Sequence, residues 1–152
     1  MFKVSQRVID RKWKKIVKNF PKFDNTVLKV GIQKDAGENF AGESIAEYAA
    51  KNEYGSRRIP ERSFIRSTID QKRPQIFKLI ANEFDKTLKL RISPERALKV
   101  VGTYVETEIK KKITALRSPP NSPVTIKRKG SSNPLIDSGL MRQSIRYNIT
   151  KE

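Results

Sequence analysis

The feature that most constrains the fold is a long amphipathic helix that opens at Ser93. Ser93-Pro94-Glu95 places a side-chain oxygen at the N-cap and a proline at the first helical position. A second apolar stripe lies just upstream, in a predicted helix over 75–90. The two stripes consist of Ile76, Ile80, Phe84 and Leu88, and of Leu98, Val101, Val105, Ile109, Ile113 and Leu116. Helices with one apolar face must bury it against another layer, so we expect them to cover a sheet.

Two short segments have the alternation of a strand with one solvated face. In 26–33 the apolar residues are Leu28, Val30 and Ile32, and in 140–150 apolar and polar residues again alternate. The sequence therefore predicts an α+β fold, in which a small antiparallel sheet is packed by several amphipathic helices within a single domain over 1–152.

Further helices are predicted at 2–20 and at 44–54. The first carries an apolar stripe that we expect to dock through Trp13, while its basic face is either solvated or binds phosphate. After the second, Gly55 fits the left-handed turn at a helix end, and Pro60 opens a short segment that brings Phe64 inward.

A long Pro-rich basic loop is predicted at 118–133. Half of the eight prolines lie between Pro119 and Pro134, and Lys127-Arg128-Lys129 adds a run of positive charge. Ser122-Pro123 is able to cap one short helical turn inside it. We expect this loop to be exposed until a neighbouring subunit or ring covers it.

The net charge and the absence of histidine and cysteine restrict the functions that this chain can have. The chain has 33 Lys+Arg against 16 Asp+Glu, a net charge of +17, and no histidine or cysteine. The commonest nucleophile–base pairs and zinc ligand sets are therefore excluded, and the charge implies polyanionic or acidic surroundings. We expect no enzymatic activity, no metal and no cofactor. The absence of a secretory signal and of a membrane-spanning apolar run predicts a soluble, non-secreted protein without a membrane partner.

One motif keeps an enzymatic alternative open. Glu108-Ile109-Lys110 matches the E-x-K fragment of metal-dependent nucleases, in which the carboxylate holds magnesium and the lysine steadies the attacking water. These residues lie within the longest predicted helix without an acidic partner upstream. We therefore rank a nuclease last.

Two blocks of sequence resemble a known family. Ala46–Gly55 followed by Ile59–Arg66 resembles the "N/H-E-Y/F-G … I-P-x-R-P-F-L-R" signature of small neck or tail proteins of tailed bacteriophages, and 122–130 with Pro134–Ile145 is similar to a second block that ends "P-L-x-D-T-G-x-L-R-N-S-I". Ser63 stands where that family usually has proline, and Ser138 where threonine is common. The matching residues are Asn52, Glu53, Tyr54, Gly55, Ile59, Pro60, Arg62, Phe64, Leu135, Asp137, Ser138, Gly139, Leu140, Ser144 and Ile145.

The resemblance implies a structural virion protein of the head–tail connector, tail-completion or virion-morphogenesis group. Such a protein forms a ring, sixfold by analogy, that joins the tail to the head connector around the DNA channel. It is assembled in the bacterial host cytoplasm and contacts connector, terminator or tail-tube proteins. Within the motif, Gly55 would allow a turn, Pro60 would fix the next segment, Phe64 would anchor it, and Asp137 and Ser138 would cap a short helix.

The positive charge then has two readings that stay open. A basic channel would hold genome DNA by non-specific phosphate contacts, or the same residues would meet acidic surfaces of adjacent rings. The alternatives to a neck protein are a tail terminator that caps the tube and a free-standing basic nucleic-acid-binding protein. The candidate residues are Lys12, Lys14, Lys15, Lys110, Lys111, Lys127, Arg128 and Lys129.

Overall fold

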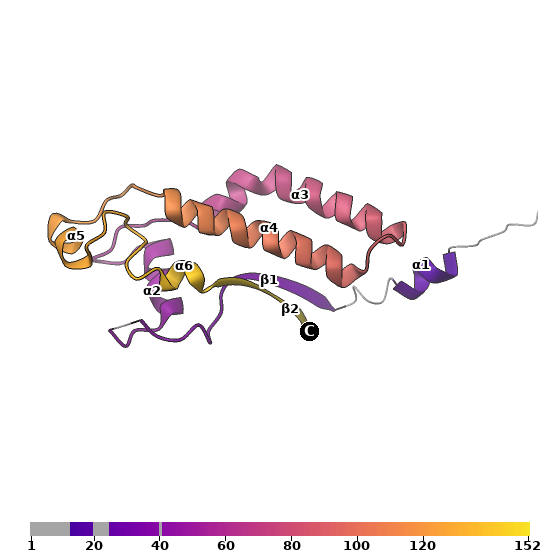
Figure 1. Cartoon of the computed structure of the whole chain (residues 1–152), viewed down its shortest axis with the longest axis horizontal. Helices are drawn as coiled ribbons and strands as arrows, with labels where there is room; N and C mark the ends of the chain where they lie inside the picture. Colours follow the sequence, from indigo (N-terminus) through magenta and orange to yellow (C-terminus); the bar gives the residue numbers. More distant parts are fainter. Residues whose placement is uncertain (1–12, 20–24, 40) are drawn as a thin grey trace, which may run out of the picture.

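A computed structural model of the chain describes residues 13–19, 25–39 and 41–152. Its central element is helix α4 (Pro94–Ala115), which lies between helix α3 (Arg66–Leu88) on one side and a two-stranded sheet on the other (Figure 1). The fold is therefore α+β, with helices covering a small antiparallel sheet, as the sequence predicts. Within the described ranges no helix has the length and apolar character needed to cross a membrane.

Helix α4 forms where its capping signal predicts. The Ser93 hydroxyl accepts a hydrogen bond from the backbone N–H of Arg96 at 3.2 Å, and Pro94 occupies the first turn. Its predicted stripe faces the core, where Ile109 and Ile113 are fully buried. Gly102 lies against Tyr147 of the sheet, and a Cβ there would come within 2.7 Å of the tyrosine ring. The close approach of helix and sheet therefore requires glycine at this position.

The sheet consists of β1 (Thr26–Ile32) and β2 (Ile145–Lys151), paired antiparallel with Leu28 opposite Ile149. Its apolar face, with Leu28, packs on the core beneath α4 as the alternation predicts. The final strand is shorter than expected, because Leu140–Gln143 forms a helical turn, α6, before it begins.

Helix α3 differs from its prediction in length and in orientation. It begins at Arg66 rather than near residue 75, and Pro74 lies inside it on the exposed side. The predicted stripe does not face inward as a whole, since Ile80 and Phe84 are 43% and 40% exposed. The buried residues of α3 are Thr68, Glu83 and Thr87, while Ile76 of the stripe is partly buried against the core. The apolar periodicity therefore predicted the helix correctly, but two of the four residues that it assigned to the core are exposed.

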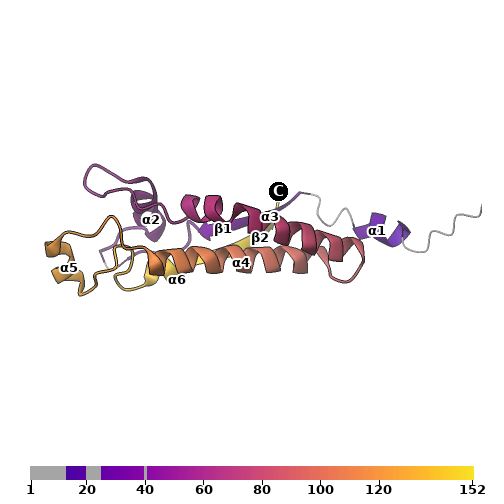
Figure 2. The same ribbon diagram turned by 90° about the horizontal axis from the view of Figure 1, so that it is seen from above.

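The remaining short elements gather at the opposite end of α4 from the α3–α4 turn (Figures 1 and 2). They are α2 (Ile45–Tyr54), α6, and α5 (Pro123–Lys129), which occupies the middle of the predicted loop. Ser122 caps α5 by accepting from the N–H of Thr125, and Gly130 ends it in the left-handed conformation. The predicted extended loop thus contains a helix longer than the single turn expected.

Helix α1 (Trp13–Asn19) lies beyond the α3–α4 turn, far from α5 in both views (Figures 1 and 2). Trp13, which we expected to dock this helix, has 60% of its surface exposed and is not part of the buried core of the described residues. The rest of the predicted 2–20 helix, including Lys12, falls outside the described residues.

Candidate functional site

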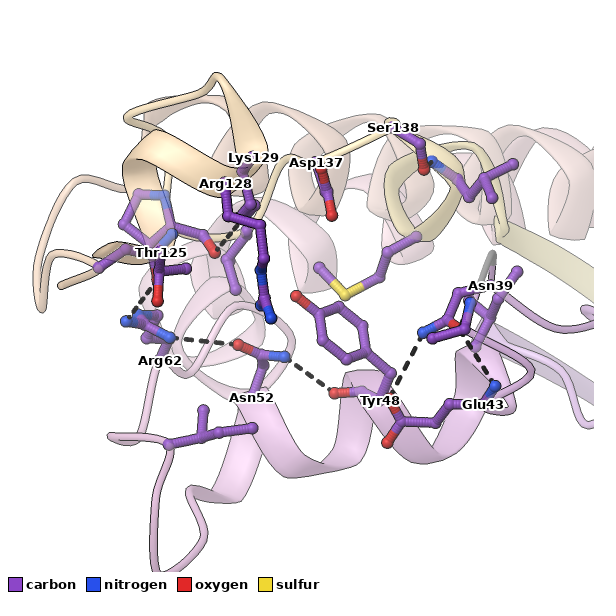
Figure 3. Close-up of a pocket in the computed structure, with 18 of the residues that line it drawn as sticks. Asn39, Glu43, Tyr48, Asn52, Arg62, Thr125, Arg128, Lys129, Asp137 and Ser138 are labelled. Atoms are coloured by element: carbon purple, nitrogen blue, oxygen red, sulfur yellow. Dashed lines mark hydrogen bonds between the residues drawn. The ribbon is translucent and has the colours of Figure 1, made fainter. Parts of the chain in front are cut away.

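The two motif blocks, far apart in the sequence, meet around one cavity. α2 and the segment that follows it form one wall, and α5, the chain after it and the start of α6 form the other (Figure 3). The cavity has a volume of about 640 Å³. Its motif residues include Asn52, Ile59, Pro60, Arg62, Leu135, Asp137, Ser138, Gly139 and Leu140.

Glu53 organises the first block from the end of α2. It is 3% exposed, and its carboxylate accepts from the backbone N–H groups of Phe64, Ile65 and Arg66 at 2.7–2.9 Å and from the Ser63 hydroxyl at 2.9 Å. Burial raises the pKa of Glu53, but these hydrogen bonds outweigh it, so the pKa is lowered overall. A buried charge on α2 thus satisfies the free N–H groups at the start of α3.

Arg62 connects the first block to the chain that precedes α5. Its guanidinium is 4% exposed and donates to the Pro119 carbonyl (2.8 Å), the Pro120 carbonyl (3.1 Å), Asn121 Oδ1 (3.0 Å) and Asn52 Oδ1 (3.3 Å). All four acceptors are neutral. Burial lowers the pKa of Arg62, and the arginine keeps its charge over the physiological range.

The other residues of the first block support this geometry. Phe64 is fully buried and anchors the segment, as expected. Gly55 has φ 76°, and a Cβ there would lie 3.0 Å from the Glu61 nitrogen, so the turn requires glycine. Tyr54 is exposed, with the Arg66 guanidinium 4.6 Å from its ring centroid.

The second block is attached to the end of α4 through Asn133. The Asn133 amide donates to the Thr114 carbonyl at 3.0 Å, and its Oδ1 accepts from the backbone N–H of Leu135 at 2.9 Å. These bonds place Leu135 in the core, where it is 2% exposed. The sequence analysis missed Asn133, although an asparagine before proline is a recognised turn signal.

The predicted cap before the last strand is only partly present. Gly139 occupies the N-cap of α6, and the Ser138 hydroxyl accepts a long bond of 3.4 Å from the N–H of Leu140. Asp137 makes no hydrogen bond to this helix among the described residues, so the cap that we predicted from it is absent. At the other end the Ser144 hydroxyl donates to the Leu140 carbonyl at 2.9 Å, which leads the chain into buried Ile145.

The basic candidates do not form one face. Lys14 and Lys15 are exposed on α1, whereas Lys127 and Arg128 are exposed on α5 at the other end of the molecule. Lys129, also on α5, is half-buried at the cavity. The remaining two candidates, Lys110 and Lys111, lie on α4. Each forms an ion pair within the helix that compensates its charge, Lys110 with Glu106 and Lys111 with Glu108.

The E-x-K fragment has the geometry of a helix surface. Glu108 is also paired with Lys72 of α3, and the intervening Ile109 is fully buried. In the described part of the chain, no three Asp or Glu side chains are grouped so that they could hold a metal ion. The fragment therefore links α3 to α4.

The structure adds an apolar surface on α3, which includes Ile80 and Phe84 of the stripe that the sequence analysis expected to be buried. Phe77, Ile80 and Phe84 lie three and four residues apart on α3 and are 64%, 43% and 40% exposed. We call these three residues the α3 apolar stripe. Ile76 and Phe77 are adjacent in the sequence, so the apolar residues of α3 cover more of the helix circumference than one buried face. This width was the sign in the sequence that part of the apolar surface would stay exposed.

Comparison with protein families, curated proteins and solved structures gives no match to this chain. The function proposed below is therefore inferred from the two motif blocks and from the surfaces of the fold.

Proposed function

We propose that this chain is a structural protein of the phage neck that assembles into a ring, completes the tail and joins it to the head connector. The resemblance of both motif blocks to neck proteins supports this role. The observation that carries the assembly step is the α3 apolar stripe.

The α3 apolar stripe is a suitable subunit contact because of how α3 is packed. Glu83 and Thr87 of the helix are buried, while Phe77 is 64% and Phe84 is 40% exposed. Burial of apolar area contributes roughly 25 cal/mol per Å². A contact in which a second copy covers these rings is therefore stabilised by their removal from water. Aromatic anchors of this kind commonly dominate binding energy at interfaces.

The charge of the chain favours partners over self-association alone. A net charge of +17 repels other copies, and this repulsion must be offset by apolar contacts, by acidic neighbours or by DNA in the channel. A ring around DNA beside acidic virion proteins meets that requirement.

The test is the mass and shape of the purified protein, alone and with tail tubes, by light scattering and negative-stain imaging. We expect rings, or density that caps the tube end. The variant Phe77→Ser should remain folded and lose assembly. Val124→Ser is the matched control, since Val124 is also exposed, at 79%, but lies on α5. A wild-type monomer that ignores both tubes and connectors refutes the proposal.

A tail terminator is the nearest alternative, and it is distinguished by binding to tubes but not to connectors. A free-standing nucleic-acid-binding protein is favoured by one observation: among the described residues, exposed Lys14, Lys15, Lys127 and Arg128 have no acidic partner. That reading predicts DNA binding by the monomer whose affinity falls steeply with salt.

A further inference from the structure

The cavity between the motif blocks contains more positive charge than the carboxylates of its wall balance. Arg62 is 4% exposed, yet its guanidinium bonds only to carbonyl and amide oxygens. A buried charge is costly unless an opposite charge compensates it. The site is therefore electropositive after its own hydrogen bonds are satisfied.

Two further cations from α5 converge on the same space. Figure 3 shows the Arg128 guanidinium directed into the cavity toward Asn52, with Lys129 beside it. Arg128 has no hydrogen-bond or ion-pair partner among the described residues. Lys129 reaches only the Pro134 carbonyl, at 3.4 Å. Burial lowers the pKa of Lys129, and the positive charges of Arg62 and Arg128 lower it further against the opposing effect of Asp137.

The acidic residues in the wall do not balance these charges. Of the two, Glu43 is ion-paired with Lys51 on α2. Asp137 is exposed and makes no ion pair within the described part of the chain. The cationic lining also includes Arg58, so one unpaired carboxylate faces four cations.

Asn121, which lines the same cavity, carries an unused hydrogen-bond donor. Asn121 Oδ1 accepts from Arg62, which orients the amide, and Asn121 Nδ2 is buried with no acceptor in the described residues. A buried N–H without an acceptor costs about 1–3 kcal/mol. Asn121 lines the cavity together with the cations, and such a group of cations is the complement of an oxyanion.

We propose that this cavity binds a carboxylate carried on an acidic and partly apolar segment of a partner protein. The ammonium and guanidinium groups hold the carboxylate, beside the side chain of Asn121. Neighbouring apolar side chains are contributed by buried Ile45, Leu135 and Met141 and by half-buried Ile59. A side chain on a protein segment enters a recess of this kind, whereas phosphates on a duplex remain on the outside of a stiff helix. The inference goes beyond ring assembly and does not depend on it.

The test is a titration of ¹⁵N-labelled full-length protein with the capped peptide acetyl-Leu-Glu-Leu-amide, followed by the side-chain amide resonances of Asn121 and Asn52. We expect saturable shifts of the Asn121 signal. The same peptide with glutamine in place of glutamate should bind at least about tenfold more weakly, because one charge-assisted contact is lost.

Two protein variants localise the effect. Arg128→Gln should weaken binding of the glutamate peptide by about tenfold, and Lys127→Gln by less than about twofold, although both remove one charge from α5. Lys127 is the matched control because it is exposed and does not line the cavity.

Several results would overturn the proposal. They are an unshifted Asn121 signal, equal binding of the glutamine peptide, and equal effects of the two variants. Inorganic phosphate or a short DNA duplex that shifts Asn121 at lower concentration than the peptide assigns the site to phosphate instead. Peptide binding is measured on single chains, so it can succeed in a protein that forms no ring and fail in one that does.

Discussion

Replacing Glu53 with glutamine is expected to destabilise the fold by about 2–4 kcal/mol. Oε2 of the carboxylate accepts from the N–H groups of Phe64 and Ile65, and Oε1 accepts from the backbone N–H and the guanidinium Nε of Arg66 and from the hydroxyl of Ser63. Glutamine retains one oxygen and turns an NH₂ group toward the donors of the other. At least two buried or half-buried donors then lack an acceptor, at about 1–3 kcal/mol each before local rearrangement.

The assay is urea denaturation at pH 7 followed by circular dichroism, with a thermal scan in parallel. A loss of about 3 kcal/mol corresponds to a fall in Tm of roughly 6–12 °C for a chain of this size. Glu47→Gln is the matched control, since Glu47 is exposed on the same helix and should change stability by less than about 0.5 kcal/mol.

The difference between wild type and Glu53→Gln should also depend on pH. The pKa of Glu53 is lower in the folded chain than its ordinary value of 4.5, so its carboxylate stabilises the fold fully above that value. The stabilisation is lost as pH falls below 4.5 through the folded pKa, and the two proteins should converge. A stability difference below about 0.5 kcal/mol at pH 7, or one that grows on acidification, would refute the role assigned to Glu53.

Three further substitutions test other parts of the fold. Gly102→Ala should lower stability by about 1–3 kcal/mol despite its better helix propensity, because the new Cβ would lie 2.7 Å from the Tyr147 ring; a higher urea midpoint would contradict this contact. Arg62→Lys should speed tryptic cleavage after Arg117, since one ammonium cannot replace four bonds to neutral acceptors; unchanged cleavage would show that these bonds do not hold the loop. Ser93→Ala should cost about 1 kcal/mol by removing the cap on α4, and an unchanged urea midpoint would argue against that cap.

Some elements could be predicted because their causes are local. Helix α4 begins where Ser93 and Pro94 supply the cap, and its stripe repeats at the helical period. Strand β1 alternates as a half-buried strand does, and Gly55 follows α2 at a backbone angle that favours glycine. In each case the deciding residues lie within a few positions of one another, so the sequence contains the whole signal.

Helix α3 shows what a local reading omits. Its start at Arg66 depends on Glu53, a residue of another helix, which satisfies the first N–H groups. The helix begins before the apolar repeat that predicted it, and Pro74 is accommodated on its exposed side. The periodicity also did not show which face of α3 packs on α4, because the apolar residues of α3 span more than one face of the helix.

The cavity, in the same way, exists only in three dimensions. The sequence alone determined the helix-and-sheet class, the capped α4 and the residues of the two motif blocks. It contained no sign that Arg62 would bond to the Pro119 carbonyl, a contact across 57 positions, or that Asn121 would keep a buried donor without an acceptor. Tertiary packing decided those features, because charge compensation and burial depend on which distant segments share a space and not on the order of residues along the chain.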